Sequence, residues 1–220
     1  MRLVLLGPQG VGKGTQAQRL CAATGAPHIS TGDLVRAEIT NGTPLGATIR
    51  AYNDRGALVP DDIIVAMAMP HLDDPKGWIL DGFPRTIPQA EALDKALGAA
   101  GTAVDAAIVF EAPDDALIER LSGRRQSKAT GKTYHVAFDP PPSDDPGPFI
   151  QRDDDQPDKI RQRLDLYHLE TEPLKTYYGE RGLLLTIAAL DTIDAVAKKV
   201  VATLQTRFPT APLAPPPATP

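Results

Sequence analysis

The sequence predicts an α/β protein built on a parallel β-sheet with helices on both faces. Short apolar runs recur between helical stretches, at residues 3–6, 28–29, 78–80, 106–110 and 183–187. Buried strands that alternate with helices are typical of βαβ units, in which the strands run parallel. The 220 residues are enough for one such domain with a sizeable core. Because ligands of these sheets bind beyond the carboxyl ends of the strands, we expect the loops that follow the strands to share one cleft.

Composition narrows the class of protein. The net charge of −5 argues against nucleic acid or an anionic membrane as the main partner. The chain shows neither a basic, apolar leader nor a run of about 18 apolar residues. The single Cys21 cannot form an internal disulfide or a zinc knuckle, so we expect it to pack in the core. We therefore expect a cytoplasmic monomer whose anion sites are assembled locally from lysine and arginine.

The first strand leads into a glycine-rich turn that predicts a phosphate-binding site. Residues 1–15 read MRLVLLGPQGVGKGT, with Gly7, Gly10, Gly12 and Gly14 around Lys13. Glycines allow positive φ and leave no Cβ in the way, so successive N–H groups can converge on a polyphosphate. The helix that follows adds the positive end of its dipole, and the lysine adds a mobile charge.

The spacing from Gly7 to Lys13 fits the P-loop motif, with one departure. Where most P-loops carry Ser or Thr after the lysine, this chain has Gly14, and the hydroxyl follows at Thr15. Phosphate binding is therefore predicted, whereas direct ligation of Mg²⁺ by the loop hydroxyl is not. A glycine-rich turn with a solvated lysine is the alternative, but it does not explain why strand, glycines, lysine and helix come in this order.

A small helical flap is predicted between the second and third strands. Ser30 or Thr31 is a candidate N-cap for a helix that reaches about residue 41. A second helical stretch covers about 45–52, and Pro60 then begins another helix. These helices interrupt the alternation of strand and helix, so we expect them to form an insertion.

The third strand ends in a carboxylate that is followed by an arginine. Asp81 stands where proteins with a P-loop hold a metal or its waters. Arg85 offers a bidentate fork for a phosphate, which a lysine would not reproduce. Pro88 then begins a helix that carries Gln89. A helix-capping Asp and a surface Arg are the alternative interpretation.

Arginines also precede and follow a long proline-rich segment. Arg120 and Arg124 lie four apart on one helix face, where they repel unless an anion lies between them. Residues 126–151 are too rich in proline for a helix and too long for a plain connection, so we expect a loop or small β excursion that acts as a lid. A long helical pattern follows Arg152, and Pro173 kinks or restarts it. The Ala/Pro-rich end of the chain is expected to be disordered.

Six motifs in order make the chain resemble the bacterial members of the adenylate kinase family, in the long-lid form without zinc cysteines. They are GPQGVGKGT, STGDLVR, LVPDD, LDGFPRTIPQ, the GRR step into the lid, and RDDDQPDKIRQRL. The resemblance implies a P-loop NTPase-type parallel five-stranded sheet, the reaction ATP + AMP ⇌ 2 ADP in nucleotide homeostasis, and Mg²⁺ as cofactor. It also implies a core of 1–29 with 60–121 and 164–205, an AMP-binding flap at 30–59, a lid at 122–163, and a disordered tail at 206–220.

The resemblance assigns roles residue by residue. The catalytic charges would be Lys13, Arg85, Arg124, Arg152 and Arg163. ATP would be bound by Gly10, Val11, Gly12, Lys13, Gly14, Thr15, Arg120, Arg124 and Tyr134. AMP would be bound by Thr31, Arg36, Leu58, Val59, Gly82, Phe83, Arg85, Gln89, Arg152 and Arg163. Asp81 would organise the waters of Mg²⁺, and Asp154 and Asp155 would orient the lid arginines.

The implied chemistry agrees with the residues. A phosphate acceptor is already ionised at pH 7, so no general base is needed, and the four histidines lie outside these motifs. Arginine, lysine and Mg²⁺ can then position the two nucleotides and neutralise the charge on the phosphates. The flap and lid would exclude water by closing.

Two departures from the family and two rival functions stay open. The lid lacks the four cysteines that bind zinc in many relatives, and Ser127, Thr130 and Asp144 only partly follow the hydrogen-bonded alternative. Ala189-Leu190-Asp191 replaces an Asp-Gly turn near the ATP adenine. The nearest rival is a kinase of another nucleoside monophosphate, UMP or CMP. A protein that only binds ATP is the other, but the chain lacks the guanine-reading motif of switch GTPases and has more arginines in these motifs than binding alone requires.

Overall fold

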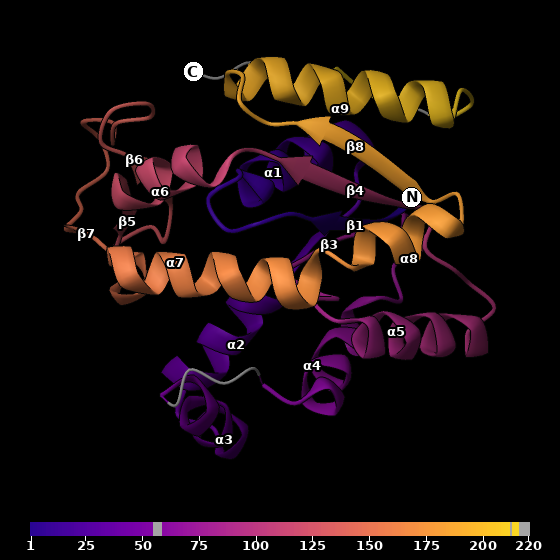
Figure 1. Ribbon diagram of the computed structural model, residues 1–220, viewed down its shortest axis with the longest axis horizontal. Helices are drawn as coiled ribbons and strands as arrows, with labels where there is room; N and C mark the ends of the chain where they lie inside the picture. Colours follow the sequence, from indigo (N-terminus) through magenta and orange to yellow (C-terminus); the bar gives the residue numbers. More distant parts are fainter. Residues whose placement is uncertain (55–58, 212, 216–220) are drawn as a thin grey trace.

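The protein is built on a five-stranded parallel sheet with the strand order β2-β3-β1-β4-β8 (Figure 1). The computed structural model describes residues 1–54, 59–211 and 213–215. The strands of the sheet are β1 (Arg2–Leu6), β2 (His28–Ser30), β3 (Trp78–Asp81), β4 (Ala106–Glu111) and β8 (Leu184–Ala188). Each contains or overlaps one of the five apolar runs, which confirms the predicted fold class.

Helices cover both faces of this sheet. The α-helices are α1 (Lys13–Thr24), α2 (Thr31–Thr40), α3 (Pro44–Asn53), α4 (Asp61–Ala68), α5 (Ile87–Ala99), α6 (Asp114–Ser122), α7 (Pro157–Leu166), α8 (Leu174–Glu180) and α9 (Ile193–Arg207). A 3₁₀ turn η1 (Met69–His71), a second one η2 (Asp153–Asp155) and a π-helical turn η3 (Tyr167–Thr171) complete them. Within the described ranges, no helix is both long and apolar enough to span a bilayer.

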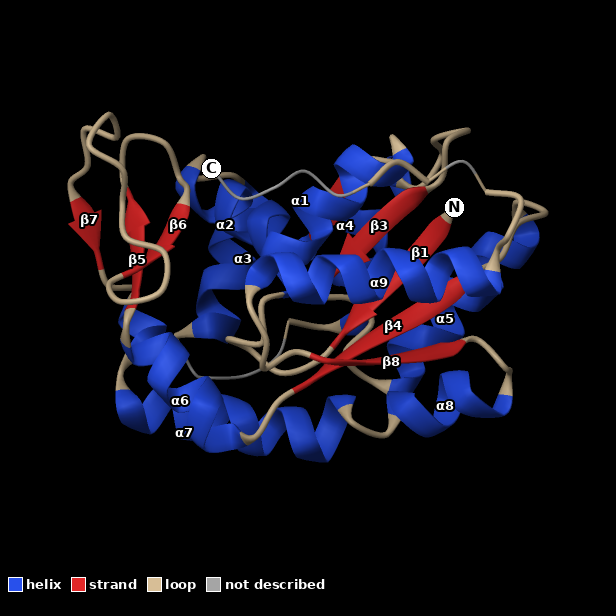
Figure 2. Ribbon diagram, turned by 90° about the horizontal axis from the view of Figure 1, so that it is seen from above, coloured by secondary structure: helices blue, strands red, loops and turns tan. Residues whose placement is uncertain are grey.

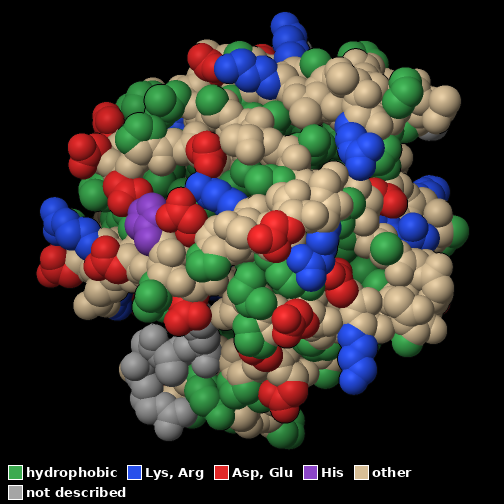
Figure 3. All heavy atoms as spheres, turned by 45° about the vertical axis from the view of Figure 1, so that its right-hand side comes forward, with side chains coloured by type: hydrophobic (Ala, Val, Ile, Leu, Met, Phe, Trp, Pro, Cys, Tyr) green, Lys and Arg blue, Asp and Glu red, His purple; other side chains and the backbone are tan. Residues whose placement is uncertain are grey.

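The strands alternate their side chains between two hydrophobic clusters, one on each face. On β1, Leu3 and Leu5 pack toward α1 and α9, whereas Val4 and Leu6 pack toward α5 and α8. This period of two is the expected consequence of a pleated strand buried on both sides. On the face seen in Figure 3, acidic and basic side chains are interspersed, in keeping with the modest net charge.

Side-chain caps begin the helices that position the flap and the loop after β3. The N-cap of α2 is Ser30, whose hydroxyl accepts the N–H of Asp33, and Thr31 is the first helical residue. Thr86 caps α5 in the same way, by accepting the N–H of Gln89. Such caps satisfy N–H groups that the helix itself leaves without partners.

The proline-rich segment forms a small antiparallel sheet of its own, with the order β6-β5-β7. Its strands are β5 (Arg124–Ser127), β6 (Thr133–His135) and β7 (Phe149–Ile150), and Figure 2 shows them apart from the main sheet. Of the two possibilities left open, a loop or a β excursion, the structure shows the second.

Asp145 holds this small sheet together. Its carboxylate accepts hydrogen bonds from Ser127 Oγ at 2.7 Å, from Thr130 Oγ1 and Tyr134 Oη at 2.8 Å each, and from the N–H of Gly147 at 3.0 Å. Burial acts to raise the pKa of this carboxyl, but the four donors hold the pKa well below its ordinary value. The prediction of Asp144 as the acidic member was wrong by one residue.

The end of the lid at residue 163 stays a prediction; α7 begins at Pro157, inside the predicted range, and buries Ile160 in the cluster that contains Leu117. The expected start of the tail differs from the structure. The tail was predicted to be disordered from residue 206, yet α9 continues to Arg207. Beyond it, Leu213 packs against the same cluster, and the N–H of Ala214 donates to Ala23 O at 2.9 Å.

Candidate phosphate-binding cleft

The loop between β1 and α1 has the shape of an anion cradle. Gly7, Gly10 and Gly12 have φ values of 138°, 83° and 99°. A Cβ on Gly7 would lie 2.6 Å from Phe110 O, so a larger residue would displace the neighbouring strand. Gly12 precedes α1, and no side chain caps the helix, which leaves the first N–H groups of α1 free to bind an anion.

Lys13 lies across this loop. Its Nζ donates to Gly7 O at 2.6 Å and to Pro8 O at 2.9 Å. The pKa of Lys13 is lowered to about 8, mainly by burial, with contributions from nearby Arg85, Arg163 and Arg124 and against the opposing effect of Asp81. The loop, the end of β3, β5 and α7 therefore bring four cations close enough to affect one another.

The turn after β3 places Asp81 and Arg85 beside the loop. Arg85 Nε donates to Gly82 O at 2.7 Å, and burial, together with Arg36, lowers the pKa of the guanidinium. Thr31 Oγ1 donates to Asp81 O at 3.3 Å. A Cβ on Gly82, whose φ is 83°, would lie 3.0 Å from that hydroxyl. Thr31, Gly82 and Arg85 are thus gathered at one edge of the sheet, as predicted.

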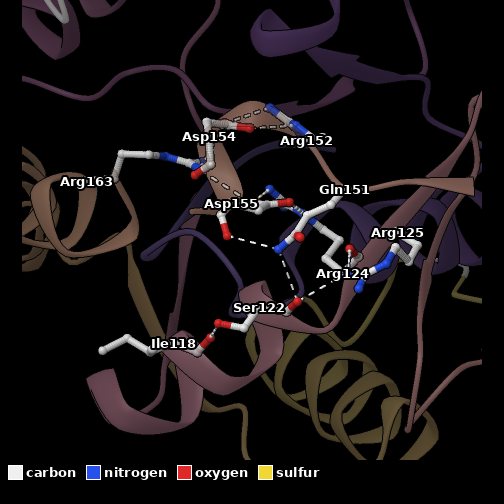
Figure 4. A network of polar contacts seen from close by, with 9 residues as sticks. All are labelled: Ile118, Ser122, Arg124, Arg125, Gln151, Arg152, Asp154, Asp155 and Arg163. Carbon is white, nitrogen blue, oxygen red and sulfur yellow. Dashed lines mark hydrogen bonds and ion pairs between the residues drawn. The ribbon is translucent and has the colours of Figure 1, made fainter. Parts of the chain in front are cut away.

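Three lid arginines are held by two neighbouring carboxylates (Figure 4). Arg124 makes a bidentate pair with the fully buried Asp155, at 2.8 and 2.5 Å. Arg152 makes a bidentate pair with Asp154, at 2.9 Å for both contacts, and Arg163 Nη1 lies 2.9 Å from the same carboxylate. These contacts agree with the expectation that Asp154 and Asp155 orient the arginines.

The lid arginines also repel one another. Burial lowers the pKa of Arg163 to about 10, and Arg124 and Arg152 contribute to the lowering. The pKa of Arg152 is lowered by burial and by the charges of Arg124 and Arg36. An anion placed among these guanidinium groups would relieve that repulsion.

The structure shows where most of the other predicted site residues lie and what they contact. Arg36 pairs with Asp33 on α2, and Arg120 Nη1 donates to Ala189 O at 2.8 Å, so that α6 contacts the turn after β8. The hydroxyl of Tyr134 donates to Asp145 Oδ2 in the lid at 2.8 Å, and its contact with ATP stays a prediction. Val59 and Phe83 are buried in the hydrophobic cluster beneath the flap. Thr15 is exposed at the start of α1, and Leu58 lies outside the described residues.

Sequence reasoning missed three residues that support the site. His28 Nε2 lies 3.5 Å from Asp81 Oδ2. Gln151 Nε2 donates to Ser122 O at 3.2 Å and to Asp155 O at 3.1 Å. Asp61 accepts a hydrogen bond from Gln89 at 2.6 Å. Only Asp61 lies in a motif that the sequence had already distinguished, LVPDD.

The comparisons with known proteins agree over most of the chain. The family model described as "Adenylate kinase" matches residues 5–183. The adenylate kinase of Carboxydothermus hydrogenoformans is 46% identical over 213 residues, which cover 93% of this chain and 100% of that protein. The adenylate kinase of Thermodesulfovibrio yellowstonii is also 46% identical, over 93% of this chain and 99% of that protein. That of Streptomyces coelicolor is 44% identical over the same shares of both chains.

Proposed function

The chain belongs to the adenylate kinase family, and we propose that the cleft described above carries out the reaction ATP + AMP ⇌ 2 ADP. The observation that supports this site is the convergence of Lys13, Arg85, Arg124 and Arg163 from separate elements of an acidic protein. Asp81, Asp154 and Asp155 lie among these cations, and a nucleoside triphosphate and a monophosphate together would supply further negative charge to them.

The two nucleotides would occupy opposite sides of this cluster. The loop N–H groups and Lys13 would hold the donor phosphates, with Arg120 near the adenine of ATP. Arg36 and Arg85 would hold the phosphate of AMP, beside Thr31 and Gly82. Arg124, Arg152 and Arg163 would neutralise the charge that spreads over the transferring phosphoryl group.

Proton transfer to a protein side chain is not required in this scheme. The attacking oxygen of AMP is ionised at pH 7, so the residues need only hold donor and acceptor in line. When bound, Mg²⁺ would neutralise charge on the donor phosphates. Asp81 suits it, because Mg²⁺ retains several waters and binds through one or two carboxylates. Nowhere in the described ranges do three His, Cys, Asp or Glu side chains come together as metal ligands.

Closure would protect the phosphoryl group from water. We assign that role to the flap at 30–59 and to the lid formed by β5, β6 and β7, since each is joined to the core at one edge of the cleft. The lid delivers Arg124 directly, from its first strand.

Turnover of ADP tests the function. Purified protein given ADP and Mg²⁺ should produce ATP and AMP in equal amounts, and a chelator should abolish the reaction. A coupled assay across AMP, CMP, UMP and GMP should give the highest kcat/KM with AMP. A chain that binds ATP without producing AMP from ADP would be a binding protein, and a preference for UMP or CMP would favour the rival kinase.

A further inference from the structure

Gln89 is a buried amide whose two polar ends are held by different neighbours. It lies in the first turn of α5, and only 3% of its surface is exposed. Its Nε2 donates to Asp61 Oδ1 at 2.6 Å, and its Oε1 accepts the backbone N–H of Arg85 at 2.7 Å. Asp61 is the first residue of α4, so the contact joins the helix that follows the flap to α5.

These neighbours determine which way the amide faces. An ionised carboxylate can only accept a hydrogen bond, and a backbone N–H can only donate one. If the amide turned over, its oxygen would face the Asp61 carboxylate and its NH₂ would face the N–H of Arg85. Both hydrogen bonds would then be lost in a buried place, where polar groups without partners are costly.

We propose that Asp61 is a positioning residue that determines base specificity, by fixing the amide orientation of Gln89. The inference rests on the proposed function and on the AMP-binding role that the family resemblance implies for Gln89, which we take to be contact with the base. The two contacts use one N–H and one lone pair, so an amide in this position still has one of each to offer a base.

The fixed orientation selects a class of base. Adenine presents an amino donor beside a ring-nitrogen acceptor, and the same pair occurs in cytosine. Hypoxanthine and uracil present the reverse, a carbonyl acceptor beside a ring N–H. An amide that cannot turn over matches one arrangement and opposes the other, so Asp61 favours amino bases over oxo bases of the same size.

The unmodified protein gives the first test. Its kcat/KM should be higher for AMP than for IMP, and higher for CMP than for UMP, by about tenfold or more in each pair. Both members of each pair have the same ring system, so the comparison does not depend on how well a purine or a pyrimidine fits the site. Equal values within both pairs, with AMP still a good substrate, would overturn the role of the amide orientation while leaving the proposed function intact.

The second test changes the carboxylate alone. Asp61→Asn has the same shape but can donate as well as accept, so it removes one of the two penalties against the turned amide while the N–H of Arg85 keeps the other. The ratio of kcat/KM for AMP over IMP should therefore fall severalfold, by about threefold or more. The KM for AMP should rise, while the KM for ATP stays unchanged. Asp62→Asn is the matched control, because it removes a charge from the same helix terminus at an exposed position.

The outcomes separate the inference from the function on which it rests. If Asp61→Asn melts like Asp62→Asn and keeps the AMP/IMP ratio of the unmodified protein, Asp61 does not set specificity. If Asp61→Asn is unfolded, the comparisons of AMP with IMP and of CMP with UMP on the unmodified protein decide whether the amide orientation is fixed. If the unmodified protein does not phosphorylate AMP at all, the proposed function and the inference fall together.

Discussion

Single cations in the cleft are held by the protein's own oxygen atoms before any nucleotide arrives. Lys13 donates to two carbonyls of its loop, and Arg152 and Arg163 share the carboxylate of Asp154. Such contacts fix each charge in place, so binding does not have to order long side chains. These contacts also compete with the ligand, because a bound phosphate must share or replace the protein oxygen atoms. Each cation therefore contributes to catalysis by the extent to which it interacts with the phosphoryl group in the transition state.

We therefore expect Lys13→Met and Arg85→Ala each to lower kcat by about 10²–10³. Removing one donor from a transition-state site has effects of this size, while far-ultraviolet circular dichroism should show an unchanged fold. Arg161→Ala is the control, since Arg161 is exposed on the same helix as Arg163 and pairs with the exposed Asp158 at 3.5 Å. Unchanged kcat in either cleft variant would remove that residue from the site.

At the scale of elements, the sequence is informative where a pattern repeats. The five strands were predicted because apolar runs and helices alternate, and the restart of the helix at Leu174 follows from Pro173. The lid sheet could not be predicted in detail, because its strands contain two to four residues and are ordered by one carboxylate. Asp144 and Asp145 are adjacent acids in irregular chain, and no periodicity distinguishes them.

The lid should loosen when Asp145 loses its charge. Asp145→Asn keeps the shape but removes the charge that strengthens four hydrogen bonds, so all four are weakened together. We expect faster hydrogen exchange across 124–150 and a smaller change in the core strands. Asp144→Asn should leave exchange unchanged, and an equal response from both variants would contradict the assignment.

A histidine joins the π-helical turn η3 to the start of α6. His168 Nδ1 lies 2.8 Å from Glu172 Oε2, and Nε2 lies 3.0 Å from Asp114 Oδ2, at the start of α6. Lys175 extends the network by pairing with Glu172 and Glu111. Both ring nitrogens face carboxylates, so both must donate, and these hydrogen bonds raise the pKa of His168 above its ordinary value.

This contact should make stability depend on pH. A raised pKa in the folded state gives stability that is complete below the unfolded pKa of about 6.5 and is lost as the pH rises through the folded value. At pH 6 we expect His168→Asn to melt up to about 2–4 °C below the unmodified protein, and no more than this because the partners of His168 are partly exposed. At pH 9 this difference in melting temperature should shrink. His71→Asn is the control, and a gap independent of pH would contradict the mechanism.

At the scale of the whole molecule, the described part of the C-terminal segment returns to the face of the sheet that α1 covers. Leu213 packs in the cluster that also contains Cys21 and Met1, and Ala214 bonds to the end of α1. Composition alone suggested a tail with nothing to pack against, because alanine and proline carry no periodic signal. Tertiary contact decided otherwise for the described part of this segment.

Removing residues 209–220 should therefore lower the melting temperature by about 2–4 °C, which corresponds to roughly 1 kcal/mol. The kcat should not change, since none of the cleft residues lies in this segment. A truncation after residue 215 keeps both contacts and should melt like the full chain. If both truncations melt alike, the docking of Leu213 and Ala214 adds no stability.

The hydrogen bonds of Gln151 have a consequence for how this protein can vary. They join the strand that leaves the lid to Ser122, where the chain enters it (Figure 4). The chain thus enters and leaves the lid at two neighbouring points. The number of residues between these points does not affect the packing of the main sheet. Segments of other lengths, or with other means of internal cohesion, could be grafted between these points without redesign of the scaffold beneath.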